Sequence, residues 1–218
     1  MSVERDFGYG IVIKLNPEFA AHAASLNAVL ASHLPYLENP KNIWHVTLFQ
    51  GVYEQQHLPK IWEEVTKIDF SNIRLNFSKI YTTHTAEPGV GHSWVDWLVD
   101  KTPELDAVHA KVVEVASPYH KENLPRCADI ESYMTDAQKD LMAKYGVTGL
   151  FESYKPHTTL FYHHPHDKAL DVSATSLEES YDMGCFIKTV IFGELGYDGN
   201  IVKEIYSHNV PATGETAE

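Results

Sequence analysis

A five-residue word occurs twice in this chain of 218 residues, and it constrains the possible fold more than any other feature. The copies, HVTLF at 45–49 and HTTLF at 157–161, match at four of their five positions. Each lies in a stretch rich in β-branched and aromatic residues, which is typical of a β-strand. The segments around the two copies also follow one another in a similar order. The repeat therefore predicts a duplicated unit that places one such strand in each half.

Periodicity and capping signals predict the elements around the repeat. Asn16 and Thr102 stand at expected helix N-caps, and a proline follows each of them at the first helical position. Asp198-Gly199-Asn200 is typical of a hairpin turn. We expect strands near 8–15, 43–50, 73–83, 92–99, 156–163, 186–196 and 201–208, helices near 17–34, 58–68, 103–117, 135–145 and 167–179, and a loop at 35–42.

The expected fold class is α+β, with a bilobal, duplicated β-α-β-α-β-β unit of pseudo-twofold symmetry. Antiparallel sheets would line a central groove, with the helices outside. We expect a single domain over 1–218, with lobe one at about 8–100 and lobe two at about 101–208. An insertion at about 118–149 interrupts the second lobe, and the residues 209–218 are expected to form a flexible tail.

The charge of the chain excludes several classes of partner. Lys and Arg together number 17 against 30 Asp and Glu, which gives a net charge of −13 with His neutral. No two basic residues are adjacent, and arginine occurs only at Arg5, Arg74 and Arg126. Long nucleic acid and anionic membranes both require clustered cations, so neither is an expected partner. A small anionic ligand held by a few fixed donors remains compatible with this composition.

Compartment signals favour a cytoplasmic protein. No apolar run approaches the length of a membrane span, and the first residues lack the layout of a secretory signal. The two cysteines, Cys127 and Cys185, have no CxxC spacing and are expected to be reduced thiols. We also expect a monomer.

The repeated word places chemically useful side chains on one face of each strand. Residues two apart in a strand point to the same side, so His45 lies beside Thr47 and His157 beside Thr159. If the halves pack about a twofold axis, both pairs converge on one groove. Two imidazoles can act as base and acid near neutral pH. The threonine hydroxyls can donate to phosphate oxygens, where charge develops in a transition state. This scheme indicates phosphoryl chemistry, and it requires no metal and no other cofactor.

Aromatic residues near the motifs are secondary candidates. Tyr162 has the wrong parity to lie beside His157, so contact with a phosphate would require a bulge or a strand end. Phe49 and Phe161 share the motif face by parity, and could floor the groove, stack on a base or pack the lobes together. Trp94 and Tyr9 could likewise stack on a nucleobase or pack in the core.

A histidine cluster at 163, 164 and 166 raises the question of a metal site. No second group of ligands stands at a recognisable spacing, and adjacent histidines in a strand point apart. We therefore expect no metal site.

The motifs H-V-T-L and H-T-T-L, one in each half, resemble those of the 2H phosphoesterase superfamily. This group includes LigT-like RNA 2′,3′-cyclic phosphodiesterases and plant cyclic phosphodiesterases. The resemblance implies a bilobal α+β fold and metal-independent cleavage of phosphodiesters, with His45 and His157 catalytic and Thr47 and Thr159 on the phosphate. Plant-type members have a tyrosine where Tyr162 stands. Many bacterial LigT-like members carry an arginine soon after the second motif, where this chain has Phe161-Tyr162.

The resulting hypothesis is a phosphodiesterase that hydrolyses 2′,3′-cyclic phosphates of nucleotides or short RNA ends. By resemblance to cyclic phosphodiesterases, His157 would be the general base and His45 the general acid. One alternative is a hydrolase of 2′–5′ oligoadenylates or cyclic dinucleotides. Another is a module that binds a nucleotide without cleaving it. The sequence leaves open the base preference and the choice between 2′ and 3′ products.

Overall fold

The computed structural model describes residues 8–33, 43–84, 93–128, 131–163, 183–196 and 198–211. The elements are β1 (Tyr9–Lys14), α1 (Pro17–His33), β2 (His45–Tyr53), α2 (Leu58–Val65), β3 (Arg74–His84), β4 (Ser93–Val99), α3 (Pro103–Ala116), β5 (His120–Glu122), α4 (Pro125–Ala128), α5 (Asp136–Tyr145), β6 (His157–His163), β7 (Met183–Phe186), β8 (Thr189–Leu195) and β9 (Ile201–Asn209), together with four short 3₁₀ turns at Gln55–His57, Ser117–Tyr119, Glu131–Tyr133 and Phe151–Ser153.

The predicted helix starts are confirmed by their capping hydrogen bonds. The backbone N–H of Phe19 donates to the Asn16 side chain over 3.0 Å at the start of α1. Thr102 accepts from the backbone N–H of Leu105 at the start of α3, over 3.2 Å. The predicted loop at 35–42 and the predicted helix at 167–179 lie outside the described residues, as do the histidines at 164 and 166.

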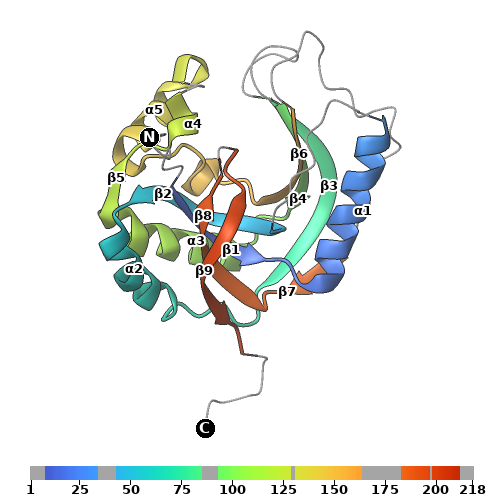
Figure 1. Ribbon diagram of the computed structural model, residues 1–218, viewed down its shortest axis with the longest axis horizontal. Coiled ribbons are helices and arrows are strands. Elements are labelled where there is room, and N and C mark those ends of the chain that lie inside the picture. The colour runs from blue at the N-terminus through green and yellow to red at the C-terminus, as the bar shows by residue number, and fades with distance from the viewer. Residues whose placement is uncertain are drawn as a thin grey trace, which may run out of the picture.

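Two antiparallel sheets form the frame of the molecule (Figure 1). Sheet one has the strand order β5-β2-β1-β8-β9, and sheet two has the order β6-β4-β3-β7. Each sheet draws strands from both halves of the sequence, so a boundary near residue 100 does not separate the two sheets. The α+β class and the paired antiparallel sheets agree with the sequence prediction.

The strand pairings show that each copy of the repeat consists of two antiparallel strands and the segment that connects them. In one copy β1 and β2 are antiparallel neighbours joined through α1, and in the other β4 and β6 are antiparallel neighbours joined through α3 and the insertion. Each helix packs on the motif strand of the other copy, α1 on β6 and α3 on β2. This exchange ties the two sheets together, because neither helix can leave without exposing the other copy's strand.

Aromatic and aliphatic side chains fill the space between helices and sheets. Trp97 of β4 is fully buried, with Phe77 at 4.2 Å and Phe19 of α1 at 6.1 Å between ring centroids. On the other side, Trp62 of α2 stacks near Phe192 of β8, with centroids 6.2 Å apart. These clusters fix α1 against sheet two and α2 against sheet one (Figure 1). Burial of such large apolar surfaces is the main favourable term in folding.

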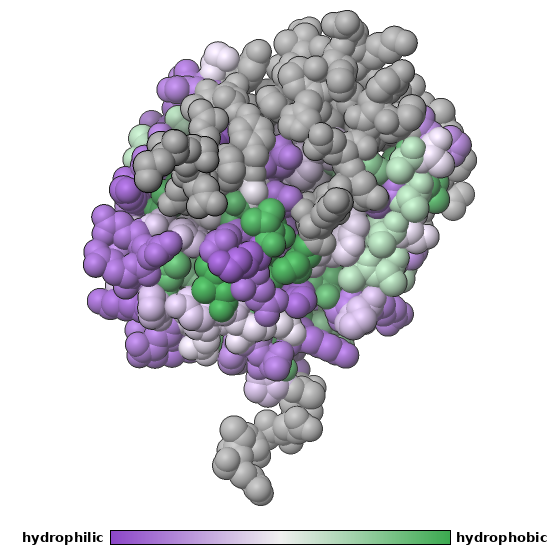
Figure 2. All heavy atoms as spheres, in the orientation of Figure 1, coloured by the Kyte–Doolittle hydropathy of each residue, from purple (hydrophilic) through white to green (hydrophobic). Residues whose placement is uncertain are grey.

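The outer surface is mixed. Figure 2 shows mostly hydrophilic residues on the side where α2 lies, with hydrophobic patches towards the middle of the face, where β9 runs. Val202 of β9 is 54% exposed, and its neighbours Lys203 and Glu204 are charged. Charges along an edge strand such as β9 oppose pairing with further strands. Across the described residues, no helix is long and apolar enough to cross a membrane.

The insertion at 118–149 is packed onto sheet one. Its apolar residues form a second, smaller core with side chains of β1, β2, β8 and β9. Val12 of β1 belongs to this cluster, and Val12 lies opposite Thr47 in the β1–β2 register. Residues directly opposite each other share a face of the sheet. The insertion therefore covers the same face of sheet one that carries the first motif. The buried members are Val12, Val52, Leu124, Cys127, Met134, Met142, Ile191, Leu195 and Ile201.

Candidate active site

The two motif strands meet at the edges of their sheets. β6 is an edge strand, and β5 pairs with β2 only at Val52 and Tyr53, so the start of β2 is an edge as well. The buried Thr158 hydroxyl of β6 donates to the His45 carbonyl of β2 over 3.0 Å. This bond joins the two motifs directly. The convergence predicted from the repeat is therefore present in the structure.

Burial alternates along both motifs as the period of a strand requires. His45, Thr47, His157 and Thr159 are partly exposed, while the residue after each histidine is buried. The structure thus brings together the four residues that carry the predicted chemistry, on the open face of their strands.

The two histidines are held in the same way. Nδ1 of His45 lies 2.6 Å from the Ile43 carbonyl, and Nδ1 of His157 lies 2.7 Å from the Lys155 carbonyl. A carbonyl can only accept, so each Nδ1 carries the hydrogen. In each neutral ring Nε2 then holds the lone pair. Both histidines therefore direct the nitrogen able to exchange a proton away from their own backbone.

The electrostatic surroundings of the two histidines differ. Burial lowers the pKa of His45 to about 4, opposed by its bond to the Ile43 carbonyl and assisted by the positive charge of His157. The imidazole of His45 is therefore neutral at pH 7. His157 faces the buried carboxylate of Asp96, with Nε2 and Oδ1 3.6 Å apart. Asp96 forms an ion pair with His157 when that ring is protonated.

Asp96 also connects the second histidine to the second threonine. The Thr159 hydroxyl donates to Oδ1 of Asp96 over 3.0 Å, and the two residues are paired in the β4–β6 register. Asp96 is not among the site residues predicted from the sequence. A carboxylate flanked by valine and tryptophan in the strand SWVDWLV was the available signal, since a buried charge requires fixed partners.

Each motif strand contains a β-bulge at the leucine after its threonine. Ile11 and Val12 of β1 pair with Phe49 and Thr47, which leaves Leu48 as an extra residue. Likewise, Val95 and Asp96 of β4 pair with Phe161 and Thr159, and Leu160 is the extra residue. A bulge reverses the facing of all residues that follow it.

The bulges decide the placement of the aromatic candidates. Phe49 and Phe161, expected on the motif face, are turned into the core and are 1% and 0% exposed. They pack the sheets and cannot stack on a ligand. Tyr162 is turned the opposite way, onto the face of Thr159, by the kind of bulge that its position required. A hydrogen bond to Thr159 is among the influences on its hydroxyl, while burial raises the pKa of Tyr162 to about 12.

The extra residue of each bulge has its carbonyl held by a side chain from the helix packed on that strand. Asn27 of α1 donates to the Leu160 carbonyl over 2.7 Å, and Nδ1 of His109 in α3 lies 2.7 Å from the Leu48 carbonyl. Asn27 and His109 are both buried. A buried carbonyl without a partner is costly, so these two side chains stabilise the bulges.

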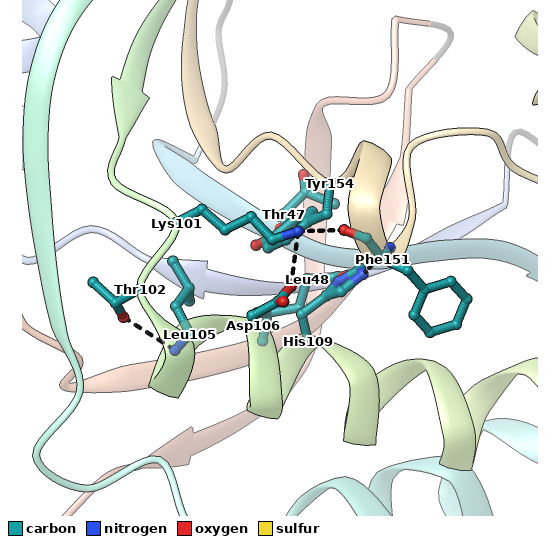
Figure 3. Close-up of polar contacts among 9 residues, drawn as sticks. All are labelled: Thr47, Leu48, Lys101, Thr102, Leu105, Asp106, His109, Phe151 and Tyr154. Atoms are coloured by element: carbon teal, nitrogen blue, oxygen red, sulfur yellow. Dashed lines mark hydrogen bonds and ion pairs between the residues drawn. The ribbon is translucent and has the colours of Figure 1, made fainter.

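Figure 3 shows the larger network around His109. The Phe151 N–H donates to Nε2 of His109 over 3.1 Å, so both ring nitrogens are used and the ring is neutral. Tyr154 stacks on His109 with ring centroids 3.8 Å apart, and its hydroxyl donates to the Thr47 carbonyl over 2.8 Å. Burial lowers the pKa of His109, in agreement with a neutral ring. The network fixes the backbone of the first motif on its outer edge.

Three further aromatic residues differ in their access to the groove. Trp94 is partly buried and lies opposite Tyr162 in the β4–β6 register, so it is placed beside the motif face. Tyr81 of β3, which the sequence analysis did not single out, lies opposite Asp96 and is 50% exposed. Tyr9, by contrast, is 5% exposed in the main core near Tyr53.

The insertion contributes a residue that sequence reasoning missed. Arg126 of α4 donates a hydrogen bond to the side chain of Gln50, which is buried in β2 three residues after Thr47. The charge of Arg126 also acts on the hydroxyl of Tyr162. The scarcity of arginine in this acidic chain was a signal, but nothing in the sequence placed Arg126 at the groove. Across the described ranges, no three His, Cys, Asp or Glu side chains gather as a metal site would require.

Comparison with solved structures gives the same fold at low sequence identity. No protein-family model and no curated protein matches the sequence. Protein TT0787 of Thermus thermophilus matches with a TM-score of 0.60 and 13% identity, over 94% of this chain and 99% of that one. A protein described as a phosphoesterase matches at 0.58 and 9%, over 94% and 99%. LigT of E. coli in complex with phosphate matches at 0.55 and 11%, over 93% and 96%. The two-lobed fold implied by the motif resemblance is therefore confirmed.

Proposed function

We propose that this protein is a phosphoesterase of the 2H type that hydrolyses 2′,3′-cyclic phosphates of nucleotides or short RNA ends. The observation that carries the proposal is the pairing of two histidines and two threonines on adjoining strand edges, with Nδ1 of each histidine bound to the carbonyl two residues before it. The fold supports it, since LigT and a protein described as a phosphoesterase share it.

The difference between the histidines supports an assignment of roles that reverses the one taken from the resemblance. His45 is neutral at pH 7 and can accept a proton at Nε2, so it is the general base. His157 pairs with Asp96 when protonated and is the general acid. In the proposed reaction His45 takes a proton from the attacking water. His157 gives a proton to the ribose oxygen as its bond to phosphorus breaks.

The hydroxyl groups complete the proposed site. Thr47 and Thr159 donate to the non-bridging phosphate oxygens, which gain charge as water adds. Thr159 donates to Asp96 in the structure, so its hydroxyl must rotate towards the phosphate when substrate binds. Tyr162 stays protonated because its pKa is raised to about 12, and it is a third donor. The groups present supply acid, base and charge stabilisation, so the proposed reaction requires no metal.

Small nucleotides are the proposed substrates. E. coli LigT has been solved in complex with 3′-AMP at a TM-score of 0.51 to this chain. Trp94 and Tyr81 lie on the motif side of sheet two, and the face of such a ring can stack on a nucleobase.

A cytoplasmic location and a monomeric state remain predictions from the sequence.

The test is turnover of the four nucleoside 2′,3′-cyclic monophosphates and of 2′–5′ linked diadenylate in excess EDTA, followed by phosphorus NMR. Rapid conversion of a cyclic phosphate to a monoester supports the proposal. Cleavage of the diadenylate alone would support the alternative hydrolase instead. Tight binding of a nucleotide with no product over hours would favour a binding protein.

A further inference from the structure

The first motif lies on a sheet edge that, in the described part of the chain, no neighbouring strand covers. The backbone N–H of Leu15 donates to the Trp44 carbonyl over 2.9 Å, so this carbonyl points towards β1. Carbonyls alternate in direction along a strand, and those of His45 and Thr47 therefore point to the opposite edge. β5 pairs with β2 only near the end of that strand and does not reach them. These two carbonyls need donors other than a strand.

Two side-chain hydroxyl groups from the segment 154–158 bind the carbonyls on this edge. Thr158 donates to the His45 carbonyl over 3.0 Å. Tyr154 donates to the Thr47 carbonyl over 2.8 Å. The donors and the acceptors follow each other in opposite order along the chain, as they would in an antiparallel pair of strands. Both donors are buried, which protects the two hydrogen bonds from competition with water.

Each of the two donors is itself held in place. The Tyr154 ring stacks on His109 of α3 with centroids 3.8 Å apart, and hydrogen bonds at both ring nitrogens fix His109 (Figure 3). Burial raises the pKa of Tyr154, so its hydroxyl remains a donor at neutral pH. Thr158 lies within β6 and is paired with Trp97 of β4. The two hydroxyl groups are therefore rigid partners for the edge of β2.

The segment 154–158 orients both histidines of the site. Its own backbone holds the second histidine, because the Lys155 carbonyl accepts from Nδ1 of His157 over 2.7 Å. Its side chains hold the backbone of the first motif, as described above. The repeated word does not itself require a hydroxyl at position 158, because Val46 fills the corresponding position of the first motif. The threonine at 158 thus adds a bond between the motifs that the repeat alone would not supply.

We propose that Thr158 and Tyr154 are positioning residues of the active site. Their hydroxyl groups replace a neighbouring strand and fix His45 and Thr47 relative to His157. The consequence for catalysis rests on the proposed function: acid, base and phosphate donor must reach the substrate together, and a misplacement of about 1 Å can cost about 100-fold in rate. Both hydroxyl groups are buried and bound to carbonyls, so they act through the first motif and not on the substrate. Their loss should lower kcat and leave KM nearly unchanged.

The first test separates the hydroxyl of Thr158 from its packing. T158V removes the hydroxyl at nearly constant volume, whereas T158S keeps the hydroxyl and removes a methyl group. For a nucleoside 2′,3′-cyclic monophosphate we expect kcat to fall about fivefold or more in T158V and to stay within about twofold of the parent in T158S. KM should stay within about twofold of the parent in both variants. Melting temperatures check that each variant is folded in the assay.

The tyrosine is tested with a matched pair of variants. Y154F keeps the ring on His109 and removes only the hydroxyl, and it should lower kcat about fivefold or more with KM nearly unchanged. Y206F is the control, at a partly buried tyrosine of β9 that stacks on Trp62, and it should equal the parent.

The second test does not depend on turnover. Relaxation-dispersion NMR detects exchange on the μs–ms timescale at the backbone amides of residues 45–48. We expect no such exchange in the parent and in Y206F. It should appear in T158V and in Y154F, because the edge of β2 then loses one of its two donors.

Full kcat in T158V and Y154F, with turnover by the parent, would overturn the positioning role and leave the proposed function standing. A loss in T158S equal to or larger than that in T158V would also overturn it, because packing and not the hydrogen bond would then matter. A parent without turnover would contradict the proposed function, and the NMR comparison would then decide the positioning role. Exchange at 45–48 in both variants would support that role, and amides unchanged from the parent would overturn it.

Discussion

We predict that the lowered pKa of His45 lets the proposed activity persist in acid. With a pKa of about 4, roughly 90% of His45 rings are neutral at pH 5, whereas a histidine at the ordinary value of 6.5 would be about 3% neutral. If His45 is the general base, kcat/KM at pH 5 should be about 30 times what an ordinary histidine would allow. The acid limb of the pH profile should then fall near pH 4.

The same shift affects stability, with a sign that follows from proton binding. Between about pH 6.5 and 4 the unfolded chain binds a proton at this position and the folded protein does not. Folding stability contributed by the neutral ring is therefore complete above pH 6.5 and is lost as pH falls towards 4.

The assay is kcat/KM for a nucleoside 2′,3′-cyclic monophosphate from pH 3.5 to 8, together with an NMR titration of the His45 ring. H157Q serves as the second arm, because it removes a positive charge that lowers the pKa of His45. We expect the NMR midpoint of His45 to be higher in H157Q than in the parent. The rise should be smaller than the lowering caused by burial, because burial is the largest influence on the pKa of His45. An NMR midpoint near 6.5 in the parent would refute the electrostatic reasoning, and an acid limb at pH 6 to 7 would refute the role as base.

Two further predictions concern side chains that support the motifs. D96N should lower kcat at least tenfold with little change in KM, because His157 loses the carboxylate that pairs with its protonated form. Steady-state kinetics measures both constants, and an unchanged kcat would contradict this role for Asp96. N27L should lower the free energy of unfolding by about 1–3 kcal/mol, because the buried Leu160 carbonyl loses its hydrogen-bond donor. Urea denaturation measures this free energy. A loss below about 0.5 kcal/mol would show that the hydrogen bond from Asn27 is dispensable.

The duplicated fold could be predicted because each signal was local. Asn16 and Thr102 marked helix starts with their own side chains, and the H-x-T-L-F word marked two strands with one pattern. The exchange of strands between the halves could not be predicted in the same way. Pairing of β1 with β8 joins residues about 180 positions apart, and nothing local in either strand specifies that partner.

In each motif strand, the residues before the β-bulge could be placed from the sequence, and those after it could not. Strict alternation correctly placed His45 beside Thr47, but after Leu48 and Leu160 it assigned the wrong face to each phenylalanine. A bulge depends on the partner strand and on donors such as Asn27, which lie far away in the sequence. Such features become visible only when the helices and strands are assembled.

The proposed function depends above all on His45 and His157 acting together as base and acid on a phosphodiester. The most direct measurement compares the parent with H45A, H157A and H33A in the hydrolysis of nucleoside 2′,3′-cyclic monophosphates in excess EDTA, where His33 is an exposed histidine at the end of α1. We predict that H45A and H157A each lose at least 100-fold in kcat while folding normally, and that H33A equals the parent. Undiminished turnover in either H45A or H157A would contradict the account.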